Sequence, residues 1–196
     1  MMRYGKSIIV LAGTLIMAST VTLAPPPVLG EGGARRDVVR QAAESAGAER
    51  AAPLSLSQHA TIMSRDGQVV RKGSNGWTCV PDDPNTSGTD SICMNEPWRN
   101  FGEALKDKKK PAVTQVGIAY MLQGDRPVSN TDPYSTEPKP GDEWVEGVGA
   151  HLMILLPDAG VLKNVPTDSK NGGPWIMWAG TPYAHLMVPI DSYPSR

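Results

Sequence analysis

The sequence predicts an α+β domain built on a mainly antiparallel sheet, with one amphipathic helix, many loops and one disulfide. Of the 196 residues, 20 are Gly and 18 are Pro, a share of roughly one in five that favours turns and short elements. Apolar runs of strand length dominate the second half of the chain, whereas helical periodicity stands out in one place. The two cysteines form an even count, as a disulfide requires.

The predicted helix begins after Asn95, whose side chain suits an N-cap, and it has Pro97 in its first turn. The lysines at 108–110 favour the negative end of the helix dipole, and Pro111 ends the helix. The apolar stripe that should face the core consists of Trp98, Phe101, Ala104 and Leu105.

Strands are predicted at 113–122, 149–156, 175–179 and 183–190, and an earlier hairpin turns at Asp66–Gly67. We expect 183–190 to lie in a sheet with 149–156, because both runs carry branched apolar residues at alternate positions and need a shared core. The side chains expected in that core are Leu152, Ile154, Leu156, Leu186, Val188 and Ile190.

Residues 1–30 have the pattern of a cleavable export signal. Arg3 and Lys6 precede an apolar stretch at 7–24, prolines follow, and Gly30–Glu31 is the preferred cut. Cleavage would leave no stable membrane anchor and would place the chain in the periplasm or the extracellular medium. A retained membrane anchor is the alternative, because the apolar stretch approaches the length that spans a bilayer.

The rest of the chain divides into two parts. Residues 31–55 are rich in Ala, Gly, Arg and Glu and lack apolar periodicity beyond Val38 and Val39, so they predict a flexible tail, with 36–49 as the candidate for a frayed helix. Residues 56–196 form the single α+β domain. Within it, the acidic segment 123–147 predicts a long polar loop, and loops of that length are often contact regions.

Charge and motifs exclude some classes of function. The formal net charge is −1 and no basic stripe appears, so nucleic acid is not an expected partner. The chain lacks Gly-x-Ser-x-Gly and His-Glu-x-x-His, the motifs of serine hydrolases and zinc proteases. We therefore expect an exported, non-enzymatic module that needs no cofactor and binds a small ligand, an ion or a protein surface.

Cys79 and Cys93 are the cysteines of the chain. In an oxidising compartment we expect them to form one disulfide, which stabilises such a fold by roughly 3 kcal/mol. The alternative is two thiols that help to hold a metal ion, although their spacing matches no common cluster.

The segment between the cysteines is similar to a calcium-binding loop in one respect. Oxygen-bearing side chains at Asp83, Asn85 and Ser87 precede a glycine, and Asp90 offers a further carboxylate. Met94 stands where a calcium loop has its bidentate Glu. A polar turn produces the same string for conformational reasons, so calcium is one of two interpretations.

The string Ala-His-Leu-Met occurs twice, around His151 and around His185. On strands, His151 shares a face with Met153, and His185 shares a face with Met187. Imidazoles and thioethers together suit copper or zinc, so the alternative function is a metal-dependent enzyme using His151, His185 and a loop carboxylate. The other interpretation is that the histidines are half-buried strand residues bonded to backbone, with methionine as core filler.

Four strings resemble a family of uncharacterised exported bacterial proteins. They are Asn-Gly-Trp-Thr-Cys at 75–79, Ser-Asn-Thr-Asp-Pro at 129–133, Gly-Gly-Pro-Trp at 172–175 and His-Leu-Met-Val-Pro at 185–189. The resemblance spans most of residues 60 to 190 and implies a single bacterial domain that carries a signal peptide. It implies no activity, ligand or catalytic residue.

Overall fold

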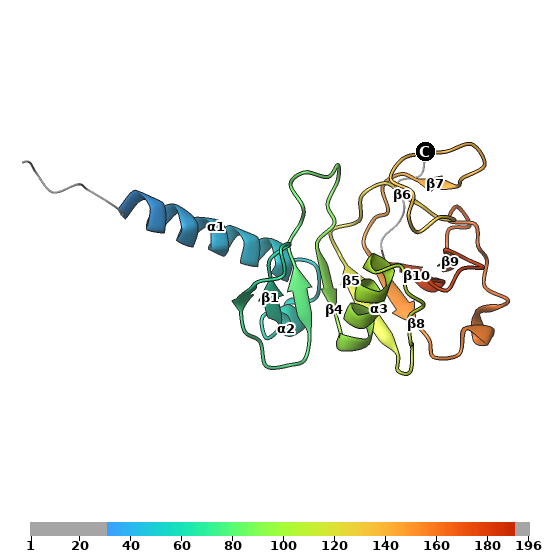
Figure 1. The fold of residues 1–196 in the computed structure, drawn as a ribbon, viewed down its shortest axis with the longest axis horizontal. Helices are drawn as coiled ribbons and strands as arrows, with labels where there is room; N and C mark the ends of the chain where they lie inside the picture. The colour runs from blue at the N-terminus through green and yellow to red at the C-terminus, as the bar shows by residue number, and fades with distance from the viewer. Residues whose placement is uncertain (1–30, 191–196) are drawn as a thin grey trace, which may run out of the picture.

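The computed structural model describes residues 31–190. The export signal expected in residues 1–30 and its cut lie outside the described residues. Figure 1 shows one continuous sheet, with a helix that leads into it from the N-terminal side. In the part of the chain that the structure describes, no helix is both long enough and apolar enough to cross a membrane.

The strands of the large sheet are β1 (Thr61–Met63), β2 (Val69–Arg71), β3 (Thr78–Val80), β4 (Ile92–Met94), β5 (Gly117–Met121), β8 (His151–Leu155), β9 (Trp175–Met177) and β10 (His185–Pro189). Strands β6 (Val128–Ser129) and β7 (Trp144–Val145) pair with each other in a second, small sheet. The helices are α1 (Glu31–Glu49), α2 (Leu54–Ser57), α3 (Glu96–Lys106) and the 3-10 helix η1 (Ala159–Leu162).

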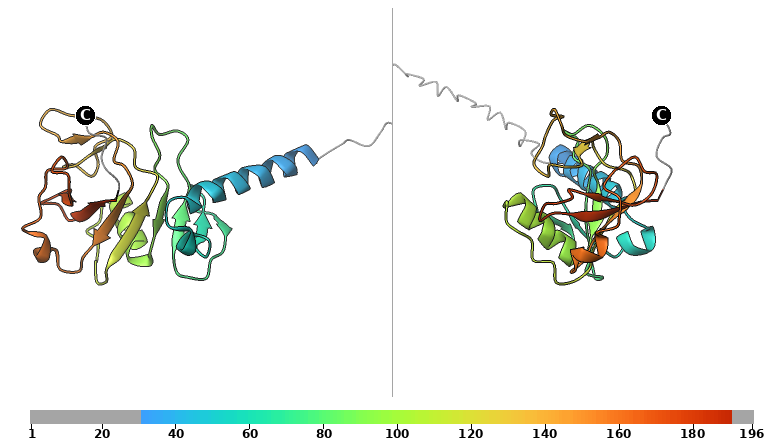
Figure 2. Two further views of the ribbon diagram at one scale, coloured as in Figure 1. Left: turned by 180° about the vertical axis from the view of Figure 1, so that it is seen from behind. Right: turned by 90° about the vertical axis from the view of Figure 1, so that its right-hand side faces the viewer.

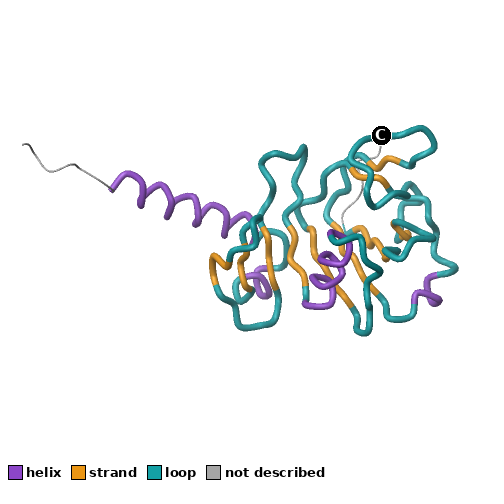
Figure 3. The backbone as a smooth tube through the Cα atoms, viewed as in Figure 1, coloured by secondary structure: helices purple, strands orange, loops and turns teal. Residues whose placement is uncertain are grey.

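The eight strands are ordered β2-β1-β3-β4-β5-β8-β10-β9. Each neighbouring pair is antiparallel except β1 and β3, so the mainly antiparallel sheet is confirmed. The expected pairing of 183–190 with 149–156 is found as the antiparallel pair β10 and β8. Figure 3 shows that loops make up much of the chain around β6, β7 and β9.

The expectation of one amphipathic helix is not met, because the described residues contain three α-helices. The predicted helix corresponds to α3, and Asn95 starts it by accepting a hydrogen bond from the backbone N–H of Trp98 at 3.2 Å. The same amide oxygen accepts from the N–H of Ile118 at 2.9 Å, which ties the helix to β5. Trp98 and Phe101 are buried beneath α3.

The segment expected to be a flexible tail is largely helical. Helix α1 extends away from the domain (Figure 1, Figure 2), yet its last turn joins a buried cluster. Ala48, Ala51 and Ala52 in this cluster are at most 5% exposed. They pack with the disulfide between Cys79 and Cys93, so the packed domain begins before residue 56.

A second and larger buried cluster lies between the sheet and α3. It combines helix residues with one face of β5, β8, β10 and β9. Its fully or nearly fully buried members are Trp98, Phe101, Ala119, Met121, Val145, Val148, Met153, Leu155, Trp175, Met177, Tyr183 and Met187.

The core side of β8 and β10 is the opposite of the one predicted. His151 and His185 are at most 1% exposed, whereas Leu152 and Leu186 are only half-buried. The reason is local: α3 packs on the histidine side, where Gly117 leaves room for neighbouring side chains. A Cβ at Gly117 would lie 2.6 Å from the Leu155 Cδ1 atom. The leucine side has no helix in front of it when the molecule is viewed from behind (Figure 2, left).

Candidate functional site

Histidines and methionines line the buried face of the sheet in three cross-strand pairs. Met121 on β5 lies opposite His151 on β8. Met153 lies opposite Met187 one step along the same face, and His185 lies opposite Met177 on β9. We call Met121, His151, Met153, Met177, His185 and Met187 the His–Met ladder.

The two imidazoles are bound to the backbone in the same way. His151 Nδ1 lies 2.7 Å from the carbonyl oxygen of Gly149, and His185 Nδ1 lies 3.0 Å from that of Tyr183. A carbonyl oxygen only accepts hydrogen bonds, so each Nδ1 carries the proton and each Nε2 presents a lone pair. Both Nε2 atoms are buried, and neither has a hydrogen-bond partner among the described residues.

Burial also disfavours the charged form of both imidazoles. It lowers the pKa of His185 to about 4, against the opposing effect of the hydrogen bond to Tyr183. His151 lowers the pKa of His185 further, and burial lowers the pKa of His151 itself. Aromatic rings surround His185 edge-on, with centroid distances of 5.2 Å to Trp98, 4.9 Å to Trp178 and 6.0 Å to Phe101.

The two imidazoles do not face each other across one cross-strand pair. His151 lies opposite Pro189, which is four residues beyond His185 on β10. At about 3.4 Å per residue, the Cα atoms of the histidines are offset by roughly 14 Å along the strands, with Met153 and Met187 between them. Among the described residues, no group of three or more His, Cys, Asp or Glu side chains could hold a metal ion. The loop carboxylate that the enzyme hypothesis requires therefore does not join the histidines.

The disulfide is confirmed. Cys79 and Cys93 lie directly opposite each other on β3 and β4, with their Cα atoms 4.0 Å apart. Both are buried and bonded to each other, so they are not available as metal-binding thiols.

The oxygens of the calcium-like segment are used to shape the loop. Asp83 accepts hydrogen bonds at 2.9 Å from both the backbone and the side-chain nitrogen of Asn85, which forms a turn of the Asx type. Asp90 is bonded to Arg65 and to the N–H of Asp83, while Ser87 is exposed. These hydrogen bonds agree with the interpretation of residues 83–90 as a polar turn.

The base of the acidic loop is fixed by a buried amide that sequence reasoning missed. Asn130 is 3% exposed; its Nδ2 donates at 2.8 Å both to Glu143 and to the carbonyl oxygen of Thr167. Its Oδ1 accepts from Trp175 Nε1 at 2.9 Å, and Glu143 also accepts from the Ser169 hydroxyl at 2.6 Å. The network joins two segments on which the resemblance to exported bacterial proteins rests, because Asn130 lies in 129–133 and Trp175 lies in 172–175.

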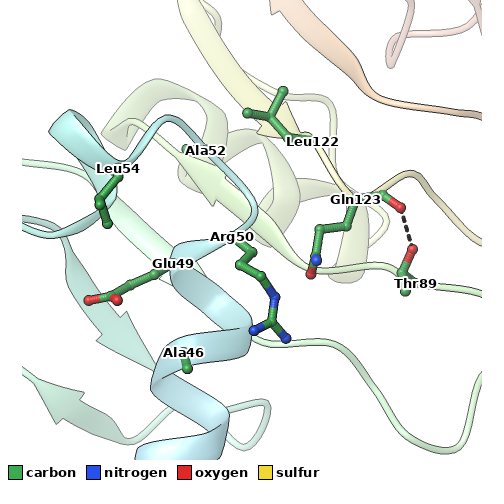
Figure 4. A pocket seen from close by; sticks show the side chains of 8 residues that line it. All are labelled: Ala46, Glu49, Arg50, Ala52, Leu54, Thr89, Leu122 and Gln123. Carbon is green, nitrogen blue, oxygen red and sulfur yellow. Dashed lines mark hydrogen bonds between the residues drawn. The ribbon is translucent and has the colours of Figure 1, made fainter. Parts of the chain in front are cut away.

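A shallow hollow lies where the end of α1 meets the end of β5 (Figure 4). Most of its polar groups already have partners: Glu49 pairs with Arg71, and the Thr89 hydroxyl donates to the Gln123 carbonyl at 2.6 Å. Only Arg50 offers a charge to a ligand there. The lining consists of Ala46, Glu49, Arg50, Ala52, Leu54, Thr89, Leu122 and Gln123.

The face of the sheet opposite the His–Met ladder is apolar, and among residues 31–190 it lies outside both buried clusters. Ile118, Leu152, Ile154, Leu186 and Val188 alternate with the ladder residues on β5, β8 and β10. Each is half-buried, and none belongs to or packs against the two buried clusters. We call these five side chains the open apolar face.

The fold and the site define a disulfide-bonded, sheet-rich domain with a histidine–methionine core on one side and an apolar surface on the other. No protein family, curated protein or solved structure matches the chain. The resemblance to exported bacterial proteins therefore stays a prediction.

Proposed function

We propose that this protein is an exported, non-enzymatic binding module and that the open apolar face is its contact surface. The main support is that this apolar face alternates with the core on three adjacent strands and, among the described residues, lies outside both buried clusters. A solvated face of an antiparallel sheet usually carries polar side chains, and a continuous apolar face marks an interaction site. The buried disulfide is compatible with export, because such bonds persist in oxidising compartments.

The shape of the face favours a protein partner over a small ligand. Small-molecule sites are concave and enclose most of the ligand. The open apolar face lies on an extended sheet, and the hollow of Figure 4 lies elsewhere, at the end of α1. A second sheet can pack flat on such a face, with about 10 Å between the two.

The partner to which we commit is a second copy of the chain. Ile118, Leu152, Ile154, Leu186 and Val188 carry no charge, so two copies of the face would meet without repulsion. Two-fold dimers bring the same patch of both subunits together, and they are the commonest oligomers of soluble proteins. A sheet-on-sheet contact would remove these side chains from water, which stabilises by roughly 25 cal/mol per Å² of apolar surface.

Sedimentation velocity over a range of protein concentrations tests the proposal. We expect the chain lacking residues 1–30 to be a dimer at micromolar concentration. The replacement Ile154→Glu should make it a monomer with an unchanged circular dichroism spectrum, because a buried, unpaired carboxylate opposes association.

Val161→Glu is the matched control, since Val161 is 63% exposed on η1 and lies outside the face. This variant should dimerise like the wild type. A wild-type chain that stays monomeric up to about 100 μM, or an Ile154→Glu variant that still dimerises, would contradict the proposal, because a specific interface binds in the micromolar range or tighter.

A further inference from the structure

The His–Met ladder contains two buried nitrogen lone pairs that nothing in the described chain satisfies. His151 and His185 are 0% and 1% exposed, and each Nε2 lacks a hydrogen-bond partner. Leaving a buried polar atom unpaired costs on the order of 1–3 kcal/mol, so two of them in one core need an explanation. Each Nδ1–H is held by a backbone carbonyl, which is also how metal-binding histidines are usually oriented.

By strand register, methionines are the cross-strand or same-face neighbours of both histidines. Met153 and Met187 face each other at the centre of the ladder. Met121 lies opposite His151, and Met177 lies opposite His185. All four methionines are at most 7% exposed, so their sulfur atoms lie away from water.

We propose that the His–Met ladder binds one Cu(I) ion through the thioethers of Met153 and Met187 and the Nε2 atom of a flanking histidine. Soft thioethers and imidazole select Cu(I), whereas divalent ions of harder character prefer carboxylate and carbonyl oxygens. Every one of these ligands is neutral, so the bound charge is only +1. The desolvation cost of an ion rises with the square of its charge, so a monovalent ion suits this buried site better than Zn²⁺ or Cu²⁺.

The ladder is separate from the open apolar face, so this inference goes beyond the proposed function and neither depends on the other. The two sets of side chains point to opposite sides of β8 and β10. Loss of metal binding would leave dimerisation untouched, and loss of dimerisation would leave metal binding untouched.

The first experiment measures binding of Ag⁺, a redox-inert probe with the ligand preference of Cu(I), by native mass spectrometry and titration calorimetry. Cu(I) itself is then measured by competition with bicinchoninate, with ascorbate as the reductant. Thiol reductants are avoided because they would open the Cys79–Cys93 disulfide. We expect one ion per chain for both metals.

The decisive variant is Met153→Leu combined with Met187→Leu. Leucine matches methionine in volume, so the fold should tolerate the change while both thioethers are lost. Affinity for Ag⁺ and Cu(I) should fall by roughly tenfold or more, as it does when a metal site loses even an outer-shell partner. Met63→Leu is the matched control, because Met63 lies on β1 at the other end of the sheet, and it should bind like the wild type.

Two histidine variants identify the nitrogen ligand. His185→Phe suits the aromatic surroundings of that site, and His151→Gln keeps a polar side chain at the other. Loss of binding in either variant, with near-ultraviolet circular dichroism retained, supports the proposal. Wild-type protein that binds neither ion, or a Met153→Leu/Met187→Leu variant that binds both with wild-type affinity, would overturn it.

Discussion

Asp125 shows how a single residue can make stability depend on pH. Its carboxyl group is packed among protein atoms, and this burial raises its pKa to about 7. The N–H and the charge of Arg126 and the charge of Arg65 lower the pKa again, while the nearby Asp90 raises it. The folded state therefore holds a proton on Asp125 that the unfolded state releases near pH 4, so this residue's contribution to stability is lost as the pH rises from about 4 to about 7.

We expect Asp125→Asn to remove this dependence. The amide is neutral at every pH, so at pH 8 the variant should exceed the wild type in free energy of unfolding by roughly 1–3 kcal/mol, and at pH 4 the gain should vanish. Urea denaturation at pH 4, 6 and 8 measures it. Glu137→Gln, at an exposed position of the same loop, should follow the wild-type curve. If the free energies of unfolding of Asp125→Asn and the wild type changed in parallel with pH, Asp125 would not be the source of the pH dependence.

The fold requires a residue without a side chain at position 73, which is Gly73. A Cβ atom there would lie 2.2 Å from the backbone of Ala60 and Thr61, and backbone cannot move aside as a flexible side chain can. We expect Gly73→Ala to destabilise the fold by about 2–4 kcal/mol, in the range of strained packing changes. Gly102→Ala in α3 is the control: a Cβ there meets nothing within 4 Å, so thermal melting should show a gain of roughly 0.5–1 kcal/mol.

At the scale of elements, the two faces that β8 and β10 share differ in how much stability their side chains supply. Leu155 is 2% exposed beneath α3, so Leu155→Ala should cost roughly 2–5 kcal/mol through transfer and cavity terms. Leu186 is half-buried on the open apolar face, so Leu186→Ala should cost about 1 kcal/mol in protein dilute enough to be monomeric. Denaturant titration of both variants checks this ranking. Equal costs would mean that the two faces are equally packed.

The disulfide joins β3 to β4, and the end of α1 packs in the same buried cluster. Replacing Cys79 and Cys93 by serine should lower stability by about 2–4 kcal/mol, because the unfolded chain regains the freedom of the closed loop. Amide exchange should then rise first in residues 80–92 and around Ala48, which packs in the disulfide cluster. Exchange in β8 and β10 should change little before global unfolding. Uniform loss of protection across the sheet would refute this order.

Local signals predicted the elements better than they predicted the packing. The N-cap at Asn95, the disulfide and the pairing of β8 with β10 follow from short patterns and are found. The choice of core face was wrong because β8 is apolar on both sides, and leucine is more hydrophobic than the His and Met that α3 in fact covers. The Asn130 network could not be predicted, since its partners lie up to 45 residues away in sequence.

As a whole, the molecule is a sheet with unequal sides. Helix α3 and the aromatic residues beneath it cover one side, and that side contains the His–Met ladder. On the other side, the five residues of the open apolar face are half-buried and, within residues 31–190, lie outside both buried clusters. The two proposals use this asymmetry separately: ion binding belongs to the buried side and self-association to the open side.

The order of the strands also bears on how fast the chain can fold. Strands β3 and β4 meet after a separation of 14 residues between their cysteines, which is a cheap loop to close. Strand β5 meets β8 only after the whole acidic loop has been brought round, and the Asn130 network holds the base of that loop. Chain entropy must be lost in closing that longer loop before the strand contacts compensate for it, so we expect the β5–β8 pairing to form more slowly than the β3–β4 pairing. We therefore expect the half of the sheet that contains both proposed sites to form after the disulfide-bonded half.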